Sequence, residues 1–387
     1  MKLSVNTTEL VNALSIATHA LSARSTMPIL EGILIETTES GISLTCSDGA
    51  MTISVSVPAE VAEEGRIVMP GRLFGDVVRK LPSGELQMTV TVNMIATLKC
   101  CGSRTTMAGK PADLFPQLPQ IDETHRVHLP QELLRDMIQE TLFAVSADES
   151  RKILTGCLLE IGGGEVRMVG CDGFRLAVRV SAIEPNIPPL NAVIPGKLLQ
   201  ELSKIISGED EATLIFGSNQ LLVELKSVRV YASLLEGEYI QYRRIIPASA
   251  QTTVHVLDKE QMALCVERAS LMARESKTNM IKMTISPSLL VITANSEMGD
   301  AYEEVQVETE GEPLEIAFNV KYVTDALKAI EDDSFLMRFN SAVSPCVVTP
   351  VEGGAYTYMI LPLRNVCARP SRRSPQRAER AAWPLCA

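Results

Sequence analysis

The sequence predicts an α+β fold of three repeated domains, each with two helices packed on antiparallel sheets. Two observations predict it: one stretch of thirteen residues occurs three times, and a similar order of strands and helices surrounds every copy. A chain of 387 residues also exceeds one ordinary hydrophobic core. The three copies are Met69–Leu81, Ile194–Ile206 and Phe318–Ile330.

Each copy consists of a strand end, a turn and a short helix with apolar residues at helical spacing. Each also has two basic residues seven positions apart, which places them on one helix face, opposite the leucines. One such pair is typical of a solvated helix face, but three pairs in register indicate a repeated basic surface. The pairs are Arg72 with Arg79, Lys197 with Lys204, and Lys321 with Lys328.

Every unit opens with a short alternating strand followed by an amphipathic helix. Pro130 and Asp258 stand just ahead of the second and third helices, where both residue types favour a helix start. The expected strands are Lys2–Val5, Arg126–Leu129 and Thr253–Val256, and the helices are Thr8–Leu21, Gln131–Val145 and Lys259–Met272.

A β-hairpin comes next in each unit. The glycine triplet 162–164 is followed by a strand, whereas a phosphate-binding loop precedes a helix, so we predict a hairpin turn there. One more strand leads into each repeated helix, and two or three follow it, such as 212–216, 220–225 and 228–234. The hairpin strands are Ile29–Thr37 with Ile42–Cys46, Ile153–Ile161 with Val166–Val169, and Met280–Ile285 with Leu289–Ala294.

The repeat places domain boundaries at residues 1–124, 125–250 and 251–365. Proline-rich or polar linkers lie near 116–124 and 247–252. The remaining segment, 366–387, is rich in Arg, Pro and Ser, and we predict a basic, disordered C-terminal tail.

The composition is that of a globular protein, with 46% hydrophobic and 21% charged residues. A net charge of −11 argues against a protein that coats nucleic acid over its whole surface. The tail has five Arg and one Glu, or +4, so the rest of the chain carries −15. Nine scattered cysteines, with no signal peptide and no long apolar run, predict a cytoplasmic protein.

The basic pairs suggest how the three units assemble. If the units pack edge to edge with all helices on one side, the pairs line a concave surface. Two chains would then close a ring of six domains, whose twelve helices, spaced about 9 Å apart, lie on a circle roughly 35 Å across. Subtracting about 10 Å for helix thickness leaves a hole of roughly 25 Å, enough for a nucleic-acid duplex. Positive charge inside such a ring would hold phosphates without reading bases.

Catalytic and metal-binding motifs are missing from the sequence. The four histidines lack cysteine or carboxylate partners at ligand spacing, so we expect no metal and no cofactor. Asp48 and Asp172 occupy equivalent places (172 − 48 = 124), and an acid before glycine is more often a turn former than a catalytic group. We therefore expect no enzyme activity; loss of a turnover on mutating either acid would contradict this.

Six motifs occur in order over residues 1–365: Met27–Leu30, Asp113–Pro116, Asp172–Val178, Tyr242–Pro247, Phe318–Val320 and Tyr358–Arg364. With these motifs the chain resembles the bacterial sliding clamps, the β subunits of DNA polymerase III. The resemblance implies a DNA clamp fold, closed by a head-to-tail homodimer into a ring around duplex DNA. It also implies tethering of the replicative DNA polymerase and opening by an ATP-driven clamp loader.

The resemblance also implies a pocket between the second and third domains, where partners with a clamp-binding motif insert a short peptide. Apolar groups rimmed by arginines suit a peptide's leucine and aromatic side chains. On this chain the pocket maps to Leu154, Cys171, Gly173, Phe174, Arg175, Leu176, Ile240, Arg244, Ile245, Met359, Ile360, Leu361, Pro362, Leu363 and Arg364.

Three features depart from the family pattern. Ile240-Gln241 stands where Pro-Asp is frequent, Phe174 stands where histidine is common, and the chain continues past Arg364. The first two could reshape the pocket and its peptide preference. The tail could attract DNA, compete for the pocket or lack a function.

Further site residues follow from family position. The resemblance implies DNA contacts at Arg24, Arg151 and Lys152, in addition to the six basic residues of the repeated helices. It places the dimer interface between Leu271 and Met272 at the end of a helix in the third domain and the region of Met107 in the first.

Two alternative functions are compatible with the sequence. One is a clamp paralogue whose altered pocket resists a clamp-binding inhibitor, which peptide affinity would test. The other is an acidic scaffold that binds proteins but not DNA. In that case, charge reversal at Lys197, Lys204, Lys321 and Lys328 would leave its function intact.

Overall fold

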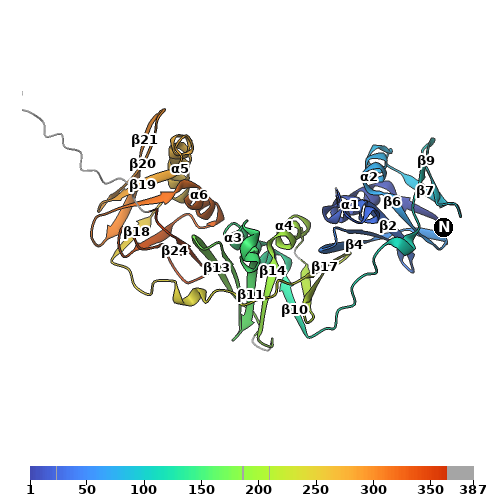
Figure 1. The fold of residues 1–387 in the computed structure, drawn as a ribbon, viewed down its shortest axis with the longest axis horizontal. Helices are drawn as coiled ribbons and strands as arrows, with labels where there is room; N and C mark the ends of the chain where they lie inside the picture. The colour runs from blue at the N-terminus through green and yellow to red at the C-terminus, as the bar shows by residue number, and fades with distance from the viewer. Residues whose placement is uncertain (23, 185–186, 209, 364–387) are drawn as a thin grey trace, which may run out of the picture.

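The computed structural model describes residues 1–22, 24–184, 187–208 and 210–363, and the predicted tail lies outside these ranges. Three domains follow one another along an open arc, with all six longer helices on its inner side and the sheets outside (Figure 1). The α+β fold of three repeated domains is therefore confirmed. Within the described ranges, no helix is long and apolar enough to cross a membrane.

Domain 1 begins with a strand whose last residue, Asn6, caps the first helix by accepting a 2.8 Å hydrogen bond from the Thr8 amide. Its helices are α1 (Thr7–Ala17) and α2 (Gly71–Lys80), with short 3₁₀ turns η1 (Thr18–Ala20), η2 (Pro28–Glu31) and η3 (Ala112–Leu114). Its strands are β1 (Lys2–Asn6), β2 (Gly32–Thr38), β3 (Gly41–Ser47), β4 (Met51–Pro58), β5 (Glu60–Glu63), β6 (Arg66–Pro70), β7 (Glu85–Val90), β8 (Ile95–Cys100) and β9 (Ser103–Ala108).

Domain 2 repeats this order. Its helices are α3 (Gln131–Leu142) and α4 (Gly196–Ile205), with 3₁₀ turns η4 (Glu149–Thr155) and η5 (Tyr242–Arg244). Its strands are β10 (His125–Pro130), β11 (Gly156–Gly162), β12 (Glu165–Cys171), β13 (Arg175–Ala182), β14 (Leu190–Pro195), β15 (Glu211–Phe216), β16 (Gln220–Glu224) and β17 (Val228–Ser233).

Domain 3 repeats it again, and Asp258 caps its first helix by accepting a 2.8 Å bond from the Gln261 amide. Its helices are α5 (Lys259–Arg274) and α6 (Val320–Ala329). Its strands are β18 (Thr252–Val256), β19 (Met280–Ile285), β20 (Leu289–Ser296), β21 (Gly299–Glu310), β22 (Leu314–Asn319), β23 (Phe335–Phe339), β24 (Cys346–Pro350) and β25 (Tyr356–Ile360).

The sheets continue across both domain boundaries. An eight-stranded sheet joins domains 2 and 1 through β17 and β4, and a twelve-stranded sheet joins domains 2 and 3 through β13 and β25. Val228 lies opposite Val55 at the first junction, and Tyr356 lies opposite Arg179 at the second. Both junctions therefore use corresponding strands, since Arg179 lies 124 residues after Val55 and Tyr356 lies 128 residues after Val228. The β9 edge of the five-stranded sheet has no such neighbour.

Buried apolar side chains hold the helices on the sheets. One core cluster is continuous through domains 1 and 2, and a second fills domain 3 and includes Ala144 and Ala177 of domain 2. The domains therefore share hydrophobic packing as well as strand pairing, which fixes the curvature of the arc.

The predicted hairpins and helices are confirmed, with differences at their ends. Residues 29–31 and 153–155, expected as strand, form 3₁₀ turns. The strands start only at Gly32 and Gly156, where a side chain would meet Val68 Cγ1 at 2.3 Å and the Ile194 carbonyl at 2.4 Å. The first helix ends at Ala17 and not at Leu21, since the Thr18 hydroxyl bonds back to the Leu14 carbonyl at 2.7 Å.

Candidate functional site

The three basic pairs lie on helices α2, α4 and α6, on the inner side of the arc (Figure 1). All six side chains are exposed, whereas Leu198, Leu199 and Leu202 on α4 are fully buried. The repeated helices therefore present their basic face to the concave surface and their leucines to the core, as the spacing predicts.

Some of this charge is already neutralised within the chain. Lys204 Nζ lies 3.0 Å from Glu201 Oε1, Arg79 Nη1 lies 3.3 Å from Asp76 Oδ1, and Lys197 pairs with Asp48 across the boundary of domains 1 and 2. Among the residues that the structure describes, Arg72, Lys321 and Lys328 have no ion-pair partner. These three offer the least compensated positive charge.

The three other basic residues lie in segments that follow the first helix of their domain. Arg24 is exposed after η1, and Arg151 and Lys152 are exposed in η4. Arg151 donates a 3.4 Å hydrogen bond to the Asp172 carbonyl. The structure thus places all nine predicted DNA-contacting side chains at the surface.

Asp48 and Asp172 are turn formers, as the sequence predicts. Asp48 Oδ1 accepts bonds from the amides of Ala50 (3.0 Å) and Met51 (2.8 Å). Asp172 Oδ1 does the same for Phe174 (2.8 Å) and Arg175 (2.9 Å). Each acid is left with one oxygen, and each uses it to bind a basic side chain.

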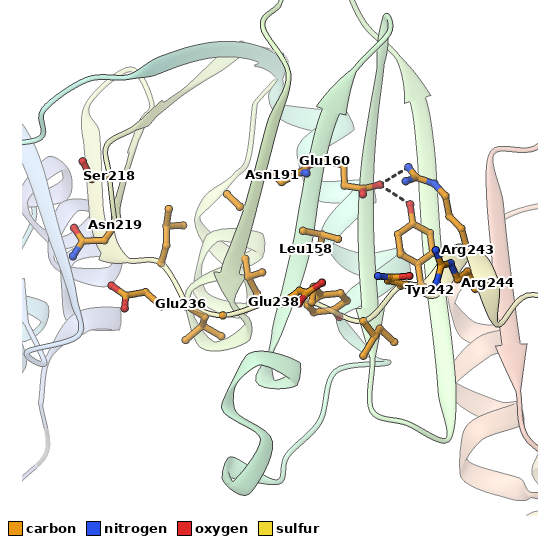
Figure 2. Close-up of a pocket in the computed structure, with 18 residues that line it drawn as sticks. Leu158, Glu160, Asn191, Ser218, Asn219, Glu236, Glu238, Tyr242, Arg243 and Arg244 are labelled. Atoms are coloured by element: carbon orange, nitrogen blue, oxygen red, sulfur yellow. Dashed lines mark hydrogen bonds and ion pairs between the residues drawn. The ribbon is translucent and has the colours of Figure 1, made fainter.

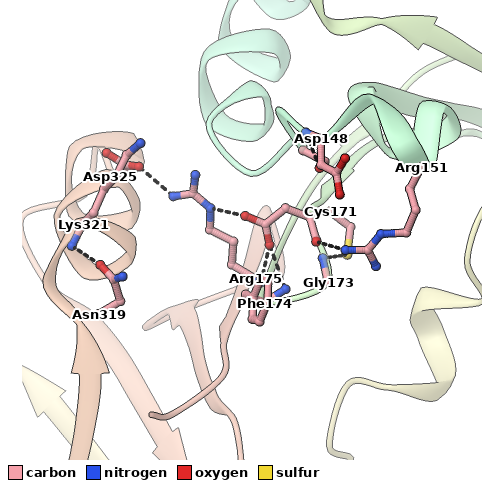
Figure 3. A network of polar contacts seen from close by, with 11 residues as sticks. Asp148, Arg151, Cys171, Gly173, Phe174, Arg175, Asn319, Lys321 and Asp325 are labelled. Carbon is pink, nitrogen blue, oxygen red and sulfur yellow. Dashed lines mark hydrogen bonds and ion pairs between the residues drawn. The ribbon is translucent and has the colours of Figure 1, made fainter. Parts of the chain in front are cut away.

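Arg175 has a role that its position in the motif does not reveal (Figure 3). Its Nε lies 3.0 Å from Asp172 Oδ2, and its Nη1 lies 2.6 Å from Asp325 Oδ2 on α6 of domain 3. The guanidinium also lies 4.6 Å from the centre of the Tyr322 ring, and the residue is only 7% exposed. Arg175 therefore connects two domains, whereas the resemblance implied an arginine on the pocket rim.

Five of the fifteen predicted pocket residues come together at the boundary of domains 2 and 3. They form one apolar cluster with Tyr239, Tyr242 and Val347, which the sequence did not assign to the pocket. Ile240 packs against this cluster. The predicted members of the cluster are Leu154, Cys171, Leu176 and Met359.

Two exposed apolar side chains, Phe174 and Ile245, lie beside this cluster, 55% and 47% exposed. The Phe174 ring stacks on Tyr322, with centroids 6.4 Å apart and planes 22° apart. Tyr322 occupies the repeat position of Leu198 (322 − 198 = 124). This correspondence is the one sequence signal that could have pointed to Tyr322 as a residue of the domain boundary. The result is an apolar surface with an aromatic platform.

The end of the described chain crosses this surface. The Leu361 amide donates a 2.9 Å bond to the Phe174 carbonyl, and the Leu363 amide donates a 2.8 Å bond to the Ala317 carbonyl. Ile360 points elsewhere, into the domain 3 core, because neighbouring strand residues face opposite sides. Arg364 lies outside the described residues.

A recess of about 660 Å³ lies on the outer side of domain 2 next to Ile240 and Arg244 (Figure 2). Glu160 lies in it and accepts bonds from the Tyr242 hydroxyl (2.5 Å) and from Arg243 Nη2 (2.7 Å). These contacts fix the 239–244 segment that borders the apolar cluster.

The predicted dimer residues lie at the two ends of the arc. Leu271 on α5 is 56% exposed, and Met272 beside it is half-buried. Met107 on β9 faces the domain 1 core and is 7% exposed. Within one chain these residues do not meet.

Comparison with known proteins agrees with this geometry in all three domains. Residues 1–119, 128–241 and 243–364 match the N-terminal, central and C-terminal domains of the DNA polymerase III beta subunit. The chain belongs to this family, the bacterial sliding clamps. The family consists of non-catalytic processivity factors of DNA polymerase, so the chain is a processivity factor and not an enzyme.

Individual sliding clamps are similar over almost the whole chain. The beta sliding clamp of Halalkalibacterium halodurans is 37% identical over 361 residues, covering 89% of this chain and 95% of the relative. That of Bacillus subtilis is 34% identical, covering 94% and 100%. A crystal structure of the Bacillus subtilis DNA polymerase sliding clamp superposes with a TM-score of 0.90 at 32% identity, over 94% of this chain and 99% of that one.

The family assignment does not favour the scaffold or paralogue alternatives. It implies association with DNA and polymerase and formation of a dimer. Within the described ranges, no group of three or more His, Cys, Asp or Glu residues could hold a metal ion.

Proposed function

We propose that two copies of this chain close head to tail into a ring that encircles duplex DNA and tethers the replicative polymerase. The observation that carries the proposal is the equivalence of the two junctions within the chain. A ring of six domains needs six junctions; each chain supplies two, and a third kind, made twice, must join the chains.

The internal junctions predict the strand pairing of this third junction. β9 corresponds to β17 (228 − 103 = 125), and β21 corresponds to β4 (303 − 55 = 248), so β9 would pair with β21 of the partner subunit. Transferring the register of Val228 opposite Val55 puts Ser103 opposite Glu303 and Met107 opposite Gly299. Arg104 would then lie diagonal to Asp300 and Glu304, an arrangement that favours opposite charges.

The same transfer brings exposed apolar side chains together. Phe174 stacks on Tyr322 at the second junction. Their repeat equivalents at the third are Met298 (298 − 174 = 124) and Leu73 (322 − 73 = 249), which are 79% and 53% exposed in the single chain. Leu198, the counterpart of Leu73 at the first junction, is 2% exposed.

The dimer residues implied by the resemblance fit this arrangement. Met272 Sδ would lie 3.8 Å from a side-chain carbon built on Gly299, so Met107 would approach Met272 of the partner subunit. Leu271 and Met272 correspond to Phe143 and Ala144, both of which pack against the domain 3 core from domain 2. We therefore include Leu73 and Met298, which the sequence did not indicate, in the proposed interface.

Duplex DNA would pass through the ring and touch mainly the helix faces. Nine basic side chains per chain contact phosphates in this proposal, which gives binding without sequence preference. The set is Arg24, Arg72, Arg79, Arg151, Lys152, Lys197, Lys204, Lys321 and Lys328.

The apolar cluster with Phe174 and Ile245 would receive the leucine and aromatic side chains of a partner peptide. The polymerase, the clamp loader that opens the ring and other proteins with such a motif would compete for it, in the cytoplasm. A Phe174→Asp variant should lose stimulation of the polymerase and remain a dimer; unchanged stimulation would contradict the pocket.

Comparing how long the protein stays on circular and on linear DNA tests whether it encircles the duplex. After loading on nicked circular DNA, the protein should stay bound at moderate salt and leave within seconds once a nuclease linearises the circle. Imaging and native mass should show six-lobed rings at twice the chain mass. Equal loss from circular and linear DNA, or monomers without a central hole, would contradict encirclement.

A further inference from the structure

A second recess, of about 380 Å³, lies beside the partner pocket on the outer face of domain 3. The linker that follows η5 passes over strands β23, β24 and β25 and forms one wall, and the strands form the floor. Lining residues include Ile246, Pro247, Ser249, Arg338, Asn340 and Thr349.

Of the described residues that line this recess, Arg338 is the only charged one. Its backbone is fixed in the middle of the sheet, opposite Thr253 on β18 and Val347 on β24. Among the described residues, its guanidinium has neither an ion-pair nor a hydrogen-bond partner, although the residue is half-buried. Arg175, Arg179 and Arg243 in the neighbouring domain are all paired with carboxylates.

A half-buried guanidinium without a partner is costly unless a ligand supplies one. The other described residues of the wall offer hydroxyl and amide groups, from Ser249, Asn340 and Thr357, and include no acid. Thr349 is 9% exposed and its hydroxyl has no partner. This environment suits an anion, and the planar fork of arginine matches a carboxylate in two hydrogen bonds.

The recess shares two residues with the apolar cluster of the proposed partner pocket. Val347 belongs to the apolar cluster of the pocket and also lines the recess, and Ile246 packs on that cluster and lines the recess as well. A peptide held by its apolar side chains in the pocket could therefore reach Arg338 with a residue a few positions away, since an extended chain spans about 3.3 Å per residue.

We propose that this recess is a second recognition site, in which Arg338 binds the carboxylate of an acidic residue that flanks the apolar anchors of a partner peptide. The proposal rests on the proposed function of the pocket. It makes Arg338 a specificity-determining residue, which ranks partners that share the same anchors by the charge next to them.

Synthetic peptides test this directly. One peptide carries only the leucine and aromatic anchors. A series adds one Asp, placed two to six positions before or after them, and each has an Asn twin. At one placement, the Asp peptide should bind the wild-type dimer about tenfold more tightly than its twin, as expected for a charge-assisted pair.

Variants of the protein test whether Arg338 causes the tighter binding of the Asp peptide. Arg338→Gln should abolish the difference between Asp and Asn and leave affinity for the anchor-only peptide unchanged. Arg338→Lys should retain part of the difference. Arg229→Gln, which removes an exposed guanidinium on β17, is the matched control and should keep all of it. A difference that persists in Arg338→Gln, or no difference at any placement, would overturn the proposal.

Two further outcomes separate this proposal from its alternatives. The first uses inorganic phosphate titrated into the protein without peptide. If phosphate binds wild type but not Arg338→Gln, and Asp peptides bind no more tightly than their Asn twins, the recess is a site for free anions and the proposed peptide recognition is overturned. An anchor-only peptide that fails to bind wild type would overturn the partner pocket itself. If the anchor-only peptide binds wild type and an Asp peptide binds more tightly, the result supports both the partner pocket and the Arg338 site.

Discussion

Arg175 shows how one side chain can define a domain boundary. It is held by Asp172 in its own domain and by Asp325 in the next, and the Tyr322 ring covers it. The same turn that Asp172 forms also presents Phe174 to the proposed partner pocket. The geometry of the pocket therefore depends on an ion pair that no peptide needs to touch.

Replacing Arg175 should destabilise the protein and distort the pocket together. We expect Arg175→Leu to lower the free energy of unfolding of the second and third domains by roughly 3 kcal/mol, because it leaves two carboxylates without a cation. Urea denaturation measures the loss, and anchor-peptide affinity should fall as well. Arg229→Leu, at an exposed pair, should change either quantity little; equal effects of both variants would contradict this role.

Glu140 is a second buried charge at this boundary, where it accepts a 2.9 Å bond from Arg179 Nε. Burial raises the pKa of its carboxyl from about 4.5 to about 7; Arg179 opposes the rise, and Glu331 and Asp136 add to it. The native state therefore holds a proton that the unfolded state releases, and this group's contribution to stability falls as the pH rises from about 4.5 to about 7.

Glu140→Gln should remove this dependence on pH. The variant should gain stability relative to wild type as the pH rises from 5 to 8, which denaturant midpoints at several pH values measure. The test uses only how the stability difference between variant and wild type changes with pH, because glutamine does not titrate and the effect of Arg179 is already contained in the pKa of Glu140. A difference that is constant with pH, or that moves the other way, would contradict the raised pKa.

At the scale of elements, the repeated helices combine two functions on opposite faces. Their leucines fill the core while their basic residues face the inside of the arc (Figure 1). Two of these basic residues, Arg79 and Lys204, are paired with acids on the same helix, which weakens but does not remove their attraction for phosphate.

Lys328 on α6 offers the clearest test of the basic faces. In a dimeric ring, Lys328→Glu removes two phosphate contacts. A plot of log affinity for linear duplex DNA against log salt has a negative slope, and its magnitude should therefore decrease by about 2. Fluorescence anisotropy at several salt concentrations measures it. Lys226→Glu, an equal charge change at the exposed turn between β16 and β17, should leave the slope unchanged. A similar loss in both variants would mean that overall charge, and not the helix face, holds the DNA.

The elements themselves could largely be predicted from the sequence, because their signals are local. The basic residues seven positions apart and the glycine turn at 162–164 each depend on a few neighbouring residues. Contacts between distant segments could not be predicted this way. Nothing near Lys197 indicates that it pairs with Asp48, which lies in another domain, and Arg175 has the same sequence context whether it forms a rim or a bridge.

At the scale of the whole molecule, the internal repeat supplies information that neither a single residue nor a single element contains. Two junctions are present in one chain, and both are antiparallel pairings of corresponding strands. The exposure of Leu73 and Leu271 has a common explanation on this basis: each lies where a neighbouring domain would cover it, at an end of the arc that has no neighbour within the chain.

Leu271→Asp should therefore dissociate the dimer. Burying one leucine stabilises an interface by about 2 kcal/mol, and a ring contains the contact twice, so the variant should weaken dimerisation roughly a thousandfold or more. Sedimentation at several concentrations measures this, and Leu73→Asp should have a similar effect from the other side. Val343→Asp, at a side chain that is 75% exposed and lies in the turn between β23 and β24, is the matched control. If Leu271→Asp stays dimeric while its circular dichroism and melting match wild type, the third junction does not follow the two internal ones, and the chains must close the ring through a different surface.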